Sequence, residues 1–335
     1  MITELNLHNV TTVNETTDKK NPANPTVAPE IEPEFGLPTD HFDPNVKASV
    51  LVEALPYIQK FAGKTIVIKY GGNAMINDEL KTQVMQDIAL MKCIGIRPVI
   101  VHGGGPDITD FLQKFGKEST FVSGLRVTDQ ETVTIAEMVL VGKLNSEIVN
   151  RLNKLGIPAV GLSGKDANLL WATKKLAEIH EDNGHSHLVD IGFVGEVQKV
   201  NTKIINDLLD NGYVPVISPI GTGKGESTYN INADYAAAEI AGALKATKLI
   251  LLTNTKGVYK VFEDPSTFLS SLSGYEAAGM INKGQISGGM IPKVEASLHA
   301  LKTGAGKVSI INGCEPHAII LELFTDNGIG TEINH

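Results

Sequence analysis

Six short runs of aliphatic residues recur along the chain, and longer segments with helical periodicity lie between many of them. The aliphatic runs lie at residues 65–69, 98–102, 159–163, 214–218, 249–253 and 308–312. The helical segments lie at residues 79–94, 129–155, 202–211 and 233–244. The runs are continuous rather than alternating, which indicates strands buried on both faces. Strands that alternate with helices in this way predict an α/β fold with a mainly parallel sheet.

Glycine follows several of the predicted strands, at Gly71, Gly103, Gly164 and Gly221. In open α/β sheets, ligands bind beyond the carboxyl ends of the strands. We therefore expect the functional site at this edge of the sheet, where the glycines allow backbone N–H groups to approach a ligand closely.

Composition excludes several classes of partner. A formal net charge of -9 argues against nucleic acid or an anionic membrane as the main partner. No apolar run reaches about 18 residues, so no membrane-spanning helix is expected. The 2 cysteines cannot form a disulfide framework and indicate a reducing compartment, so we expect a cytoplasmic protein.

The N-terminal part of the chain falls into two segments. Residues 1–44 are rich in Thr, Asn, Pro and Glu and lack the pattern of a signal or transit peptide, which predicts a disordered tail. Residues 45–62 show helical spacing of apolar side chains, with Pro44 near the start and Gly63 after the end. This helix either covers its own domain or contacts another subunit, because an apolar stripe before the first strand has no required place in the core.

Two glycine-containing stretches are predicted to lie outside the main sheet. Residues 188–200 alternate in polarity, which predicts a hairpin beside the sheet, after a turn at residues 182–185. His185 and His187 are interpreted as solvated surface, and no metal site is predicted. Residues 221–225, G-T-G-K-G, lack the spacing of a P-loop and are interpreted as a mobile loop.

Several familiar catalytic motifs are absent from the sequence. The first predicted strand is not followed by G-x-G-x-x-G, and the chain has neither the protein-kinase motif pair H-R-D and D-F-G nor the G-x-S-x-G nucleophile elbow. Hydride transfer, P-loop chemistry and hydrolase chemistry therefore lose support.

Glycine-rich turns follow the first two predicted strands. Lys69 precedes Gly71 and Gly72, and a lysine at the end of a buried strand is costly unless an anion meets it. The alternative is a snorkelling lysine in a plain strand–turn–helix unit. The second turn, from His102 to Pro106, offers N–H groups at a helix start that suit a phosphate or a carboxylate; a flexible loop is the alternative.

Three further segments offer charged or amide side chains. Arg126 stands among apolar residues and glycine, where it could pair bidentately with a carboxylate or form a surface salt bridge. Asn230 and Asp234 are placed for substrate contact and lysine positioning, although Asn232 or Asp234 could simply cap the next helix. Lys293 follows a glycine loop and, taken alone, would be a solvated charge.

In this order, the segments K-x-G-G, H-G-G-G, G-x-R-x-T, N-x-N-A-D and G-G-M-x-x-K resemble the amino-acid kinase family, and the resemblance runs from about residue 46 to residue 333. It implies a three-layer αβα sandwich with a mainly parallel central sheet. It further implies a kinase domain over residues 63–335, with the acid bound by an N-lobe at about 63–215 and ATP by a C-lobe at about 216–335. The reaction implied is phosphorylation of the side-chain carboxylate of N-acetyl-L-glutamate, with Mg²⁺ held mainly by the nucleotide phosphates.

The resemblance assigns roles residue by residue. Lys69 and Lys293 are implied to flank the transferring phosphoryl group, and Asp234 to orient both lysines. The backbone N–H groups of Gly104 and Gly105 are implied to hold the reacting carboxylate of the substrate. The side chains of Arg126 and Asn230 are implied to hold its other end. The residues implied to contact the nucleotide are Gly71, Gly72, Thr253, Asn254 and Met290. Many relatives have Asp where this chain has Asn254.

The two ends of the chain resemble the arginine-inhibited members of the family. Residues 321–331 are similar to their C-terminal signature, and residues 45–62 to the helix that builds their hexamers as trimers of dimers. L-Arginine is therefore expected as an inhibitor, with His317 and Glu322 as candidate contacts; both could instead be ordinary parts of a final helix. Relatives of this kind can also bind a nitrogen-regulatory protein, although no residue here decides that point.

Two alternatives to this reading stay open. Another member of the family, acting on aspartate, glutamate, carbamate or UMP, would share most of these motifs, although Arg126 with Asn230 favours an amino-acid-like substrate. A catalytically inactive arginine sensor would not need the two lysines and Asp234, so their presence argues against it.

Overall fold

The computed structural model describes residues 43–75, 77–180, 186–261 and 264–335. The predicted tail lies almost wholly outside the described residues, as do His185 and the turn expected at residues 182–185. None of the described helices is both long enough and apolar enough to cross a bilayer.

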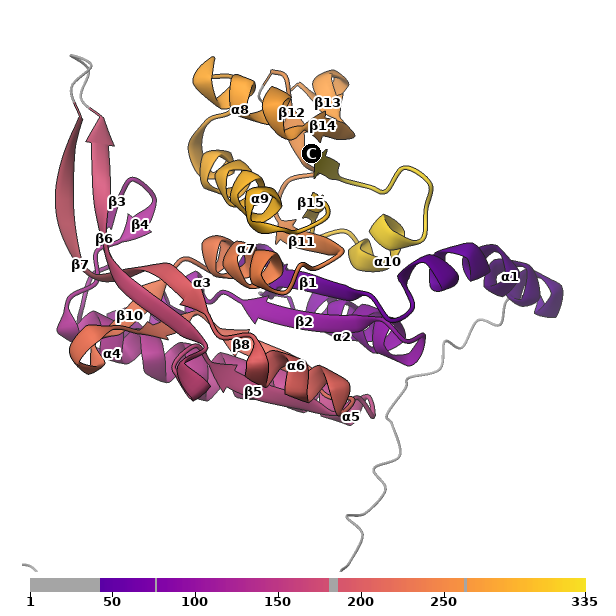
Figure 1. Ribbon diagram of the computed structural model, residues 1–335, viewed down its shortest axis with the longest axis horizontal. Helices are drawn as coiled ribbons and strands as arrows, with labels where there is room; N and C mark the ends of the chain where they lie inside the picture. The colour runs from indigo at the N-terminus through magenta and orange to yellow at the C-terminus, as the bar shows by residue number, and fades with distance from the viewer. Residues whose placement is uncertain (1–42, 76, 181–185, 262–263) are drawn as a thin grey trace, which may run out of the picture. The chain divides into compact units, whose positions relative to one another are not determined.

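The central sheet has eight strands in the order β14-β16-β15-β11-β1-β2-β8-β5 (Figure 1). Six of them are the predicted strands: β1 (Thr65–Tyr70), β2 (Arg97–His102), β5 (Ala159–Ser163), β8 (Val214–Ser218), β11 (Lys248–Thr253) and β15 (Val308–Asn312). Two short strands at one edge were not predicted, β14 (Ser271–Ser273) and β16 (Thr331–Asn334). Only the pair of β15 and β16 is antiparallel, so the sheet is mainly parallel, as predicted.

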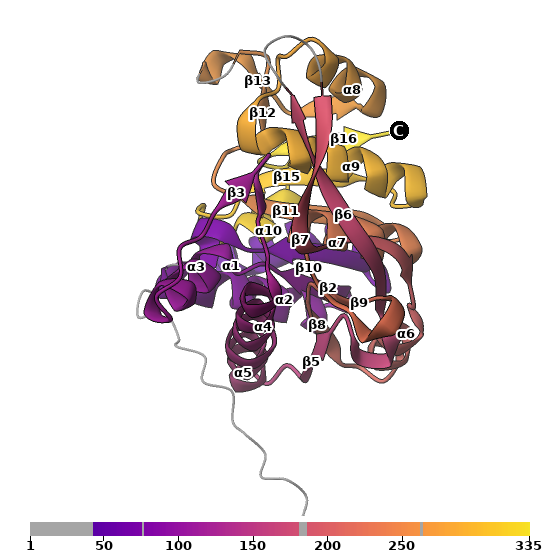
Figure 2. The ribbon, with the colours of Figure 1, turned by 90° about the vertical axis from the view of Figure 1, so that its left-hand side faces the viewer.

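Alternate side chains of the central strands pack into two separate cores, one on each face of the sheet. In β1, for example, Ile66 and Ile68 belong to one core and Val67 to the other. The first core is covered by α2 (Asp78–Cys93), α3 (Gly105–Lys114), α4 (Gln130–Glu137), α5 (Ser146–Lys154) and α10 (Ala318–Leu323). The second is covered by α6 (Lys203–Asp210), α7 (Ala233–Ala243), α8 (Gly274–Asn282) and α9 (Ile291–Thr303) (Figure 2). The predicted three-layer αβα architecture is confirmed.

The helix predicted over residues 129–155 is not α-helical throughout. Between α4 and α5 the chain forms a π-helical segment, η2 (Met138–Asn145). Its apolar residues keep a helical spacing, so the sequence pattern does not reveal the change of pitch. π-Helical turns are rare, and they occur frequently at functional sites.

The hairpin predicted at residues 188–200 is wrong, because this stretch lies within a single long strand, β7 (Ser186–Val200). β7 pairs with β6 (Leu170–His180), and these two strands close a small second sheet with β9 (Ile220–Thr222) and β10 (Thr228–Ile231). Gly192 is not a turn residue: its φ is 85°, it forms an isolated β-bridge with Thr128, and a Cβ there would collide with the Thr128 carbonyl, which accepts from the Phe193 N–H. Residues 221–225, expected as a mobile loop, contain the end of β9 and a 3₁₀ turn, η4 (Lys224–Glu226).

The predicted N-terminal helix is present as α1 (Pro44–Phe61), with the Asp43 side chain accepting a hydrogen bond from the Asn45 N–H. Its end is anchored, because Phe61 is buried in the core and the Tyr57 hydroxyl donates to Asp326 Oδ1 at 2.6 Å. Five other apolar side chains of the helix are 48–70% exposed, at Val46, Val50, Leu51, Val52 and Leu55. These side chains therefore do not cover the domain to which the helix is attached.

Candidate active site

The two predicted glycine turns lie side by side at the carboxyl edge of the sheet. β1 and β2 are parallel neighbours, with Tyr70 opposite His102, and the Gly103 N–H donates to Tyr70 O at 2.8 Å. Strand order reverses direction at β1, since β2 lies on one side of it and β11 on the other. A reversal of this kind marks the usual ligand crevice of an open α/β sheet.

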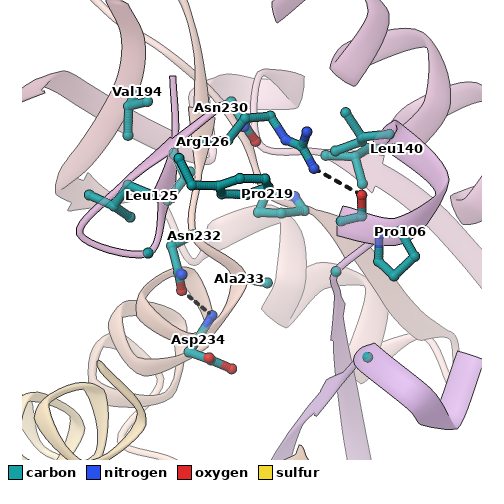
Figure 3. Close-up of a pocket in the computed structure, with 18 of the residues that line it drawn as sticks. Pro106, Leu125, Arg126, Leu140, Val194, Pro219, Asn230, Asn232, Ala233 and Asp234 are labelled. Atoms are coloured by element: carbon teal, nitrogen blue, oxygen red, sulfur yellow. Dashed lines mark hydrogen bonds between the residues drawn. The ribbon is translucent and has the colours of Figure 1, made fainter. Parts of the chain in front are cut away.

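A cavity of about 290 Å³ opens beyond these strand ends, and it collects most of the predicted catalytic and substrate residues (Figure 3). The predicted residues that line it are Lys69, Gly72, Gly104, Gly105, Arg126, Asn230 and Asp234. Gly71 lies just behind this lining, where a Cβ would be 3.2 Å from Lys69 Nζ. The cavity therefore brings two cationic side chains, a carboxylate, an amide and the backbone of both glycine turns around one space.

Asp234 joins the two predicted catalytic lysines. Lys69 Nζ lies 3.0 Å from its Oδ1, and Lys293 Nζ lies 2.7 Å from its Oδ2. Burial alone would raise the pKa of this carboxyl group, but the two ammonium groups outweigh burial and lower its pKa to about 2. Asp234 is therefore ionised at neutral pH and holds both lysines in place; it cannot serve as a general base.

Asn232 caps α7, which leaves Asp234 available for the lysines. The Asn232 side-chain oxygen accepts a hydrogen bond from the Asp234 N–H at 2.9 Å (Figure 3). It also accepts from the Tyr235 N–H at 3.3 Å. An asparagine at this position satisfies the otherwise unpaired N–H groups of the first helical turn. The alternative in which Asp234 itself caps the helix is excluded by these contacts.

The second glycine turn leads directly into α3, and Gly104 is the residue at its N-cap. No hydrogen bond joins the N–H groups of Gly104 or Gly105 to any described residue, so both are available to an anion. Glycine is needed at Gly104 for space rather than for its backbone angles, because a Cβ there would collide with Leu140 and Leu144 of η2.

Arg126 reaches the cavity from a short hairpin, β3 (Phe121–Val122) and β4 (Leu125–Arg126). Its guanidinium donates to Gly105 O and Thr109 Oγ1, both at 2.9 Å, and to the Ser119 hydroxyl, and it lies over the Phe121 ring. Burial lowers the pKa of this group, and no carboxylate among the described residues pairs with it. These contacts use three of its five N–H donors. The surface salt bridge considered from the sequence is therefore not what the structure contains.

A second cavity, of about 510 Å³, lies among residues of the C-terminal half. Of the predicted nucleotide residues, Asn254 and Met290 line it, whereas Thr253 lies behind and its hydroxyl donates to Asn254 Oδ1 at 3.3 Å. Met290 immediately precedes α9, whose first turn carries Lys293. The lysine–aspartate–lysine triad thus connects elements that line the two cavities.

The two candidate effector residues hold the last helix in place. Glu322 Oε1 accepts a hydrogen bond from Lys248 Nζ at 2.8 Å, and Oε2 accepts from the N–H groups of Ile329 and Gly330. His317 precedes α10 and contacts the buried Asp87 at 2.7 Å through Nδ1. Because both oxygens of Glu322 already have partners, these contacts favour the structural alternative for that residue.

Several residues that support the site were not predicted from the sequence. Thr109 and Ser119 orient Arg126, and Leu140, Val194 and Pro219 complete the cavity wall. They come from segments without a recognisable motif, so only the tertiary structure identifies them. No group of three or more His, Cys, Asp or Glu side chains that could hold a metal ion occurs among the described residues.

Comparison with known proteins gives consistent matches. The chain matches the model of the amino acid kinase family over residues 64–312. It is 58% identical over 288 residues to the acetylglutamate kinase of Desulfitobacterium hafniense, covering 86% of this chain and 97% of that protein.

Two solved structures of N-acetylglutamate synthase from Neisseria gonorrhoeae also match 86% of this chain. The complex with coenzyme A and N-acetyl-glutamate has a TM-score of 0.73 at 28% identity, over 63% of that chain. The complex with coenzyme A and L-arginine has a TM-score of 0.69 at 27% identity, over 65% of that chain. The family model spans well over half of the residues and the kinase is matched almost end to end, so this chain belongs to the amino acid kinase family.

Proposed function

We propose that this protein phosphorylates the side-chain carboxylate of N-acetyl-L-glutamate with ATP, giving N-acetyl-glutamyl 5-phosphate and ADP, as a cytoplasmic step of arginine biosynthesis. The observation that carries this proposal is the Lys69–Asp234–Lys293 triad, beside a cavity lined by an arginine that pairs with no carboxylate of the described residues. The substrate follows from the 58% identity to a kinase named for it. The acid occupies the cavity of about 290 Å³ and ATP the cavity of about 510 Å³.

The nucleophile in this reaction needs no base. A carboxylic acid of this type has a reference pKa near 4.3, so the substrate is already ionised at neutral pH. One carboxylate oxygen forms a bond to the γ-phosphorus, the bond from that phosphorus to the β–γ bridging oxygen breaks, and ADP leaves with that electron pair. No proton is transferred, which agrees with a site that holds no available general base.

Electrostatics is the main obstacle to the reaction, because an anion must attack a polyanion. Lys69 and Lys293 screen this repulsion from two sides, and Asp234 prevents either ammonium group from turning away. The free N–H groups of Gly104 and Gly105 fix the attacking carboxylate. Mg²⁺ enters as part of the MgATP substrate, held mainly by the nucleotide phosphates.

The proposed function is tested by incubating the protein with ATP, Mg²⁺, N-acetylglutamate and hydroxylamine, which traps an acyl phosphate as a coloured hydroxamate. Strong colour with N-acetylglutamate is expected. Colour only with unacetylated glutamate or aspartate would keep the family and change the substrate. Absence of colour with every acid would favour an inactive sensor and overturn the proposal.

Replacing Arg126 by alanine is expected to raise the KM for N-acetylglutamate by about 10- to 100-fold, since a hydrogen bond to a charged group contributes about 1.5–3 kcal/mol. Its guanidinium keeps two N–H donors available for the carboxylate end of the substrate that does not react. The KM for ATP should stay unchanged, because ATP occupies the other cavity. An unchanged KM for N-acetylglutamate would refute this role, and Arg126→Lys tests whether the fork or only the charge matters.

We further propose that arginine inhibits the enzyme and that α1 builds a homo-oligomer, a hexamer formed as a trimer of dimers. The exposed apolar face of α1 and the match to a synthase solved with L-arginine support this proposal. His317 remains a candidate effector contact, Glu322 would bind an effector only by giving up one of its present partners, and a nitrogen-regulatory protein remains a candidate partner.

Deleting residues 1–55 is expected to abolish arginine inhibition and lower the oligomer order while kcat is retained. The deletion stops before Tyr57 and Phe61, because these residues anchor the helix to its own domain. Light scattering after size-exclusion chromatography measures the assembly, and an arginine titration measures inhibition. Full inhibition in the truncated protein would contradict the regulatory role of α1.

A further inference from the structure

A buried polar pair, His102 and Asn145, lies directly behind the glycine turn that leads into α3. His102 is fully buried at the end of β2, and Asn145 is 4% exposed at the end of the π-helical segment η2. Neither residue lines the acid cavity, and the mechanism above uses neither of them.

The hydrogen bonds of this pair fix the tautomer of the histidine ring. Asn145 Nδ2 lies 2.9 Å from Val216 O, which can only accept, so the amide nitrogen must face that side. The same nitrogen lies 3.2 Å from His102 Nε2, which is therefore the acceptor. The ring proton must then be on Nδ1, which donates to Gly103 O at 2.9 Å.

This last hydrogen bond determines where the Gly104 N–H points. Gly103 C=O and Gly104 N–H belong to one trans peptide plane, in which the two groups point in opposite directions. Holding the Gly103 oxygen toward His102 therefore directs the Gly104 N–H away from the core, and no described residue accepts from it. Burial lowers the pKa of His102 to about 4, so the ring stays neutral and keeps both a donor and an acceptor at working pH.

The π-helical segment η2 supplies the residue that contacts His102. Asn145 is its last residue, and Leu140 and Leu144 of the same segment fill the space where a side chain at Gly104 would lie. A Cβ at Gly161 of β5 would collide with Asn145 Oδ1, so the absence of a side chain there leaves room for the amide. Residues of η2 and β5 thus lie behind His102, and it is His102 that contacts the Gly103 carbonyl.

We infer that His102 and Asn145 are positioning residues, which aim the Gly104 N–H at the attacking carboxylate through the Gly103–Gly104 peptide plane. This inference rests on the proposed function. It gives the H-G-G-G histidine a role through its backbone neighbour rather than through contact with the substrate.

Replacing His102 by leucine is expected to lower kcat by about 10- to 100-fold. This loss is smaller than the roughly 10²–10³ loss from deleting a donor, because the Gly104 N–H is misaligned rather than removed. The KM for ATP should not change. His102→Asn keeps a donor near the position of Nδ1 and should recover most of kcat, whereas Asn145→Leu should resemble His102→Leu. If Asn145→Leu does not fold, Gly161→Ala displaces the same amide.

Ser218→Ala is the matched control, because it removes a buried hydrogen bond, to Leu162 O, from the strand next to β2 without touching the turn. Its kcat should equal that of the wild type. If the wild-type protein is active and His102→Leu has the same kcat, this inference is overturned while the proposed function stands. The inference is also overturned if His102→Asn loses as much kcat as His102→Leu.

A second measurement requires no substrate and therefore separates this inference from the proposed function. Hydrogen–deuterium exchange of residues 102–105 should be faster in His102→Leu than in wild type, because the Gly103 N–H, bonded to Tyr70 O, belongs to the released turn. Exchange should be near wild type in His102→Asn and in Ser218→Ala. Equal exchange in all four proteins would overturn the inference, whether or not N-acetylglutamate is the substrate.

Discussion

Replacing either Lys69 or Lys293 by alanine is expected to lower kcat by roughly 10²–10³, equivalent to about 2.7–4 kcal/mol of transition-state stabilisation. Each lysine is held by one oxygen of Asp234, so its ammonium group is oriented before the nucleotide binds. Negative charge is redistributed over the phosphoryl oxygens as the reaction proceeds, and a fixed cation stabilises that distribution without reorganising. The effect should therefore appear in kcat rather than in either KM.

Steady-state kinetics with both substrates checks this prediction. Lys203→Ala is the control, because this side chain is 78% exposed and its ion pair with Asp207 lies within one turn of α6, far along the chain from the turns that form the site. Losses in Lys69→Ala and Lys293→Ala should not add in the double variant, since both lysines are held by one carboxylate and stabilise the same transferring group. Near wild-type kcat in either single variant would remove that lysine from the mechanism.

The central sheet was predictable because the aliphatic runs are continuous and alternate with helical segments, which is the pattern of parallel strands between two helical layers. The position of the site followed from the same reasoning, because Lys69 and the H-G-G-G turn come at the ends of neighbouring strands. The local pattern could not predict which strands pair with one another. Residues 188–200 alternate as one strand or as two arms of a hairpin would, and only the partner strand β6 decides between them.

Side-chain roles were predictable only where two residues are close in sequence. Asn232 caps α7 and Asp234 pairs with the catalytic lysines, and both residues lie within one helical turn. Both roles could therefore be proposed from the N-x-N-A-D motif alone. The contacts of Glu322 with Lys248 and of Asn145 with His102 join residues distant in the sequence. A change from α to π pitch in η2 leaves no mark in apolar spacing, which is why the support of the glycine turn could not be foreseen.

Replacing Asp234 by asparagine is expected to destabilise the protein as well as inactivate it. The pKa of Asp234 is lowered from 3.8 to about 2 in the folded protein, which corresponds to about 2 kcal/mol of unfolding free energy at neutral pH. This is less than the roughly 3–5 kcal/mol typical of a broken buried ion pair. The reason is that the Lys293 side chain is 19% exposed and Lys69 lines a cavity, so both can regain water.

The pH dependence of this effect has a definite sign. A carboxyl group whose pKa is lower in the folded state stabilises the protein above its unfolded pKa, and that stabilisation is lost as the pH falls through the folded pKa. The difference in unfolding free energy between wild type and Asp234→Asn should therefore be constant above about pH 5 and shrink between about pH 4 and pH 2. Denaturant unfolding at a series of pH values measures it.

Subtracting the variant from the wild type removes the contribution of every other carboxylate, because asparagine does not titrate and the remaining groups are shared. Asp207→Asn provides the control: this exposed carboxylate pairs with Lys203 on the surface of α6, and such pairs contribute about 0–1 kcal/mol. A difference for Asp234→Asn that grows toward low pH would mean that burial, rather than the two lysines, dominates the carboxyl group. In that case Asp234 would be protonated more readily than we infer, and it could not hold Lys69 and Lys293 as a charged pair.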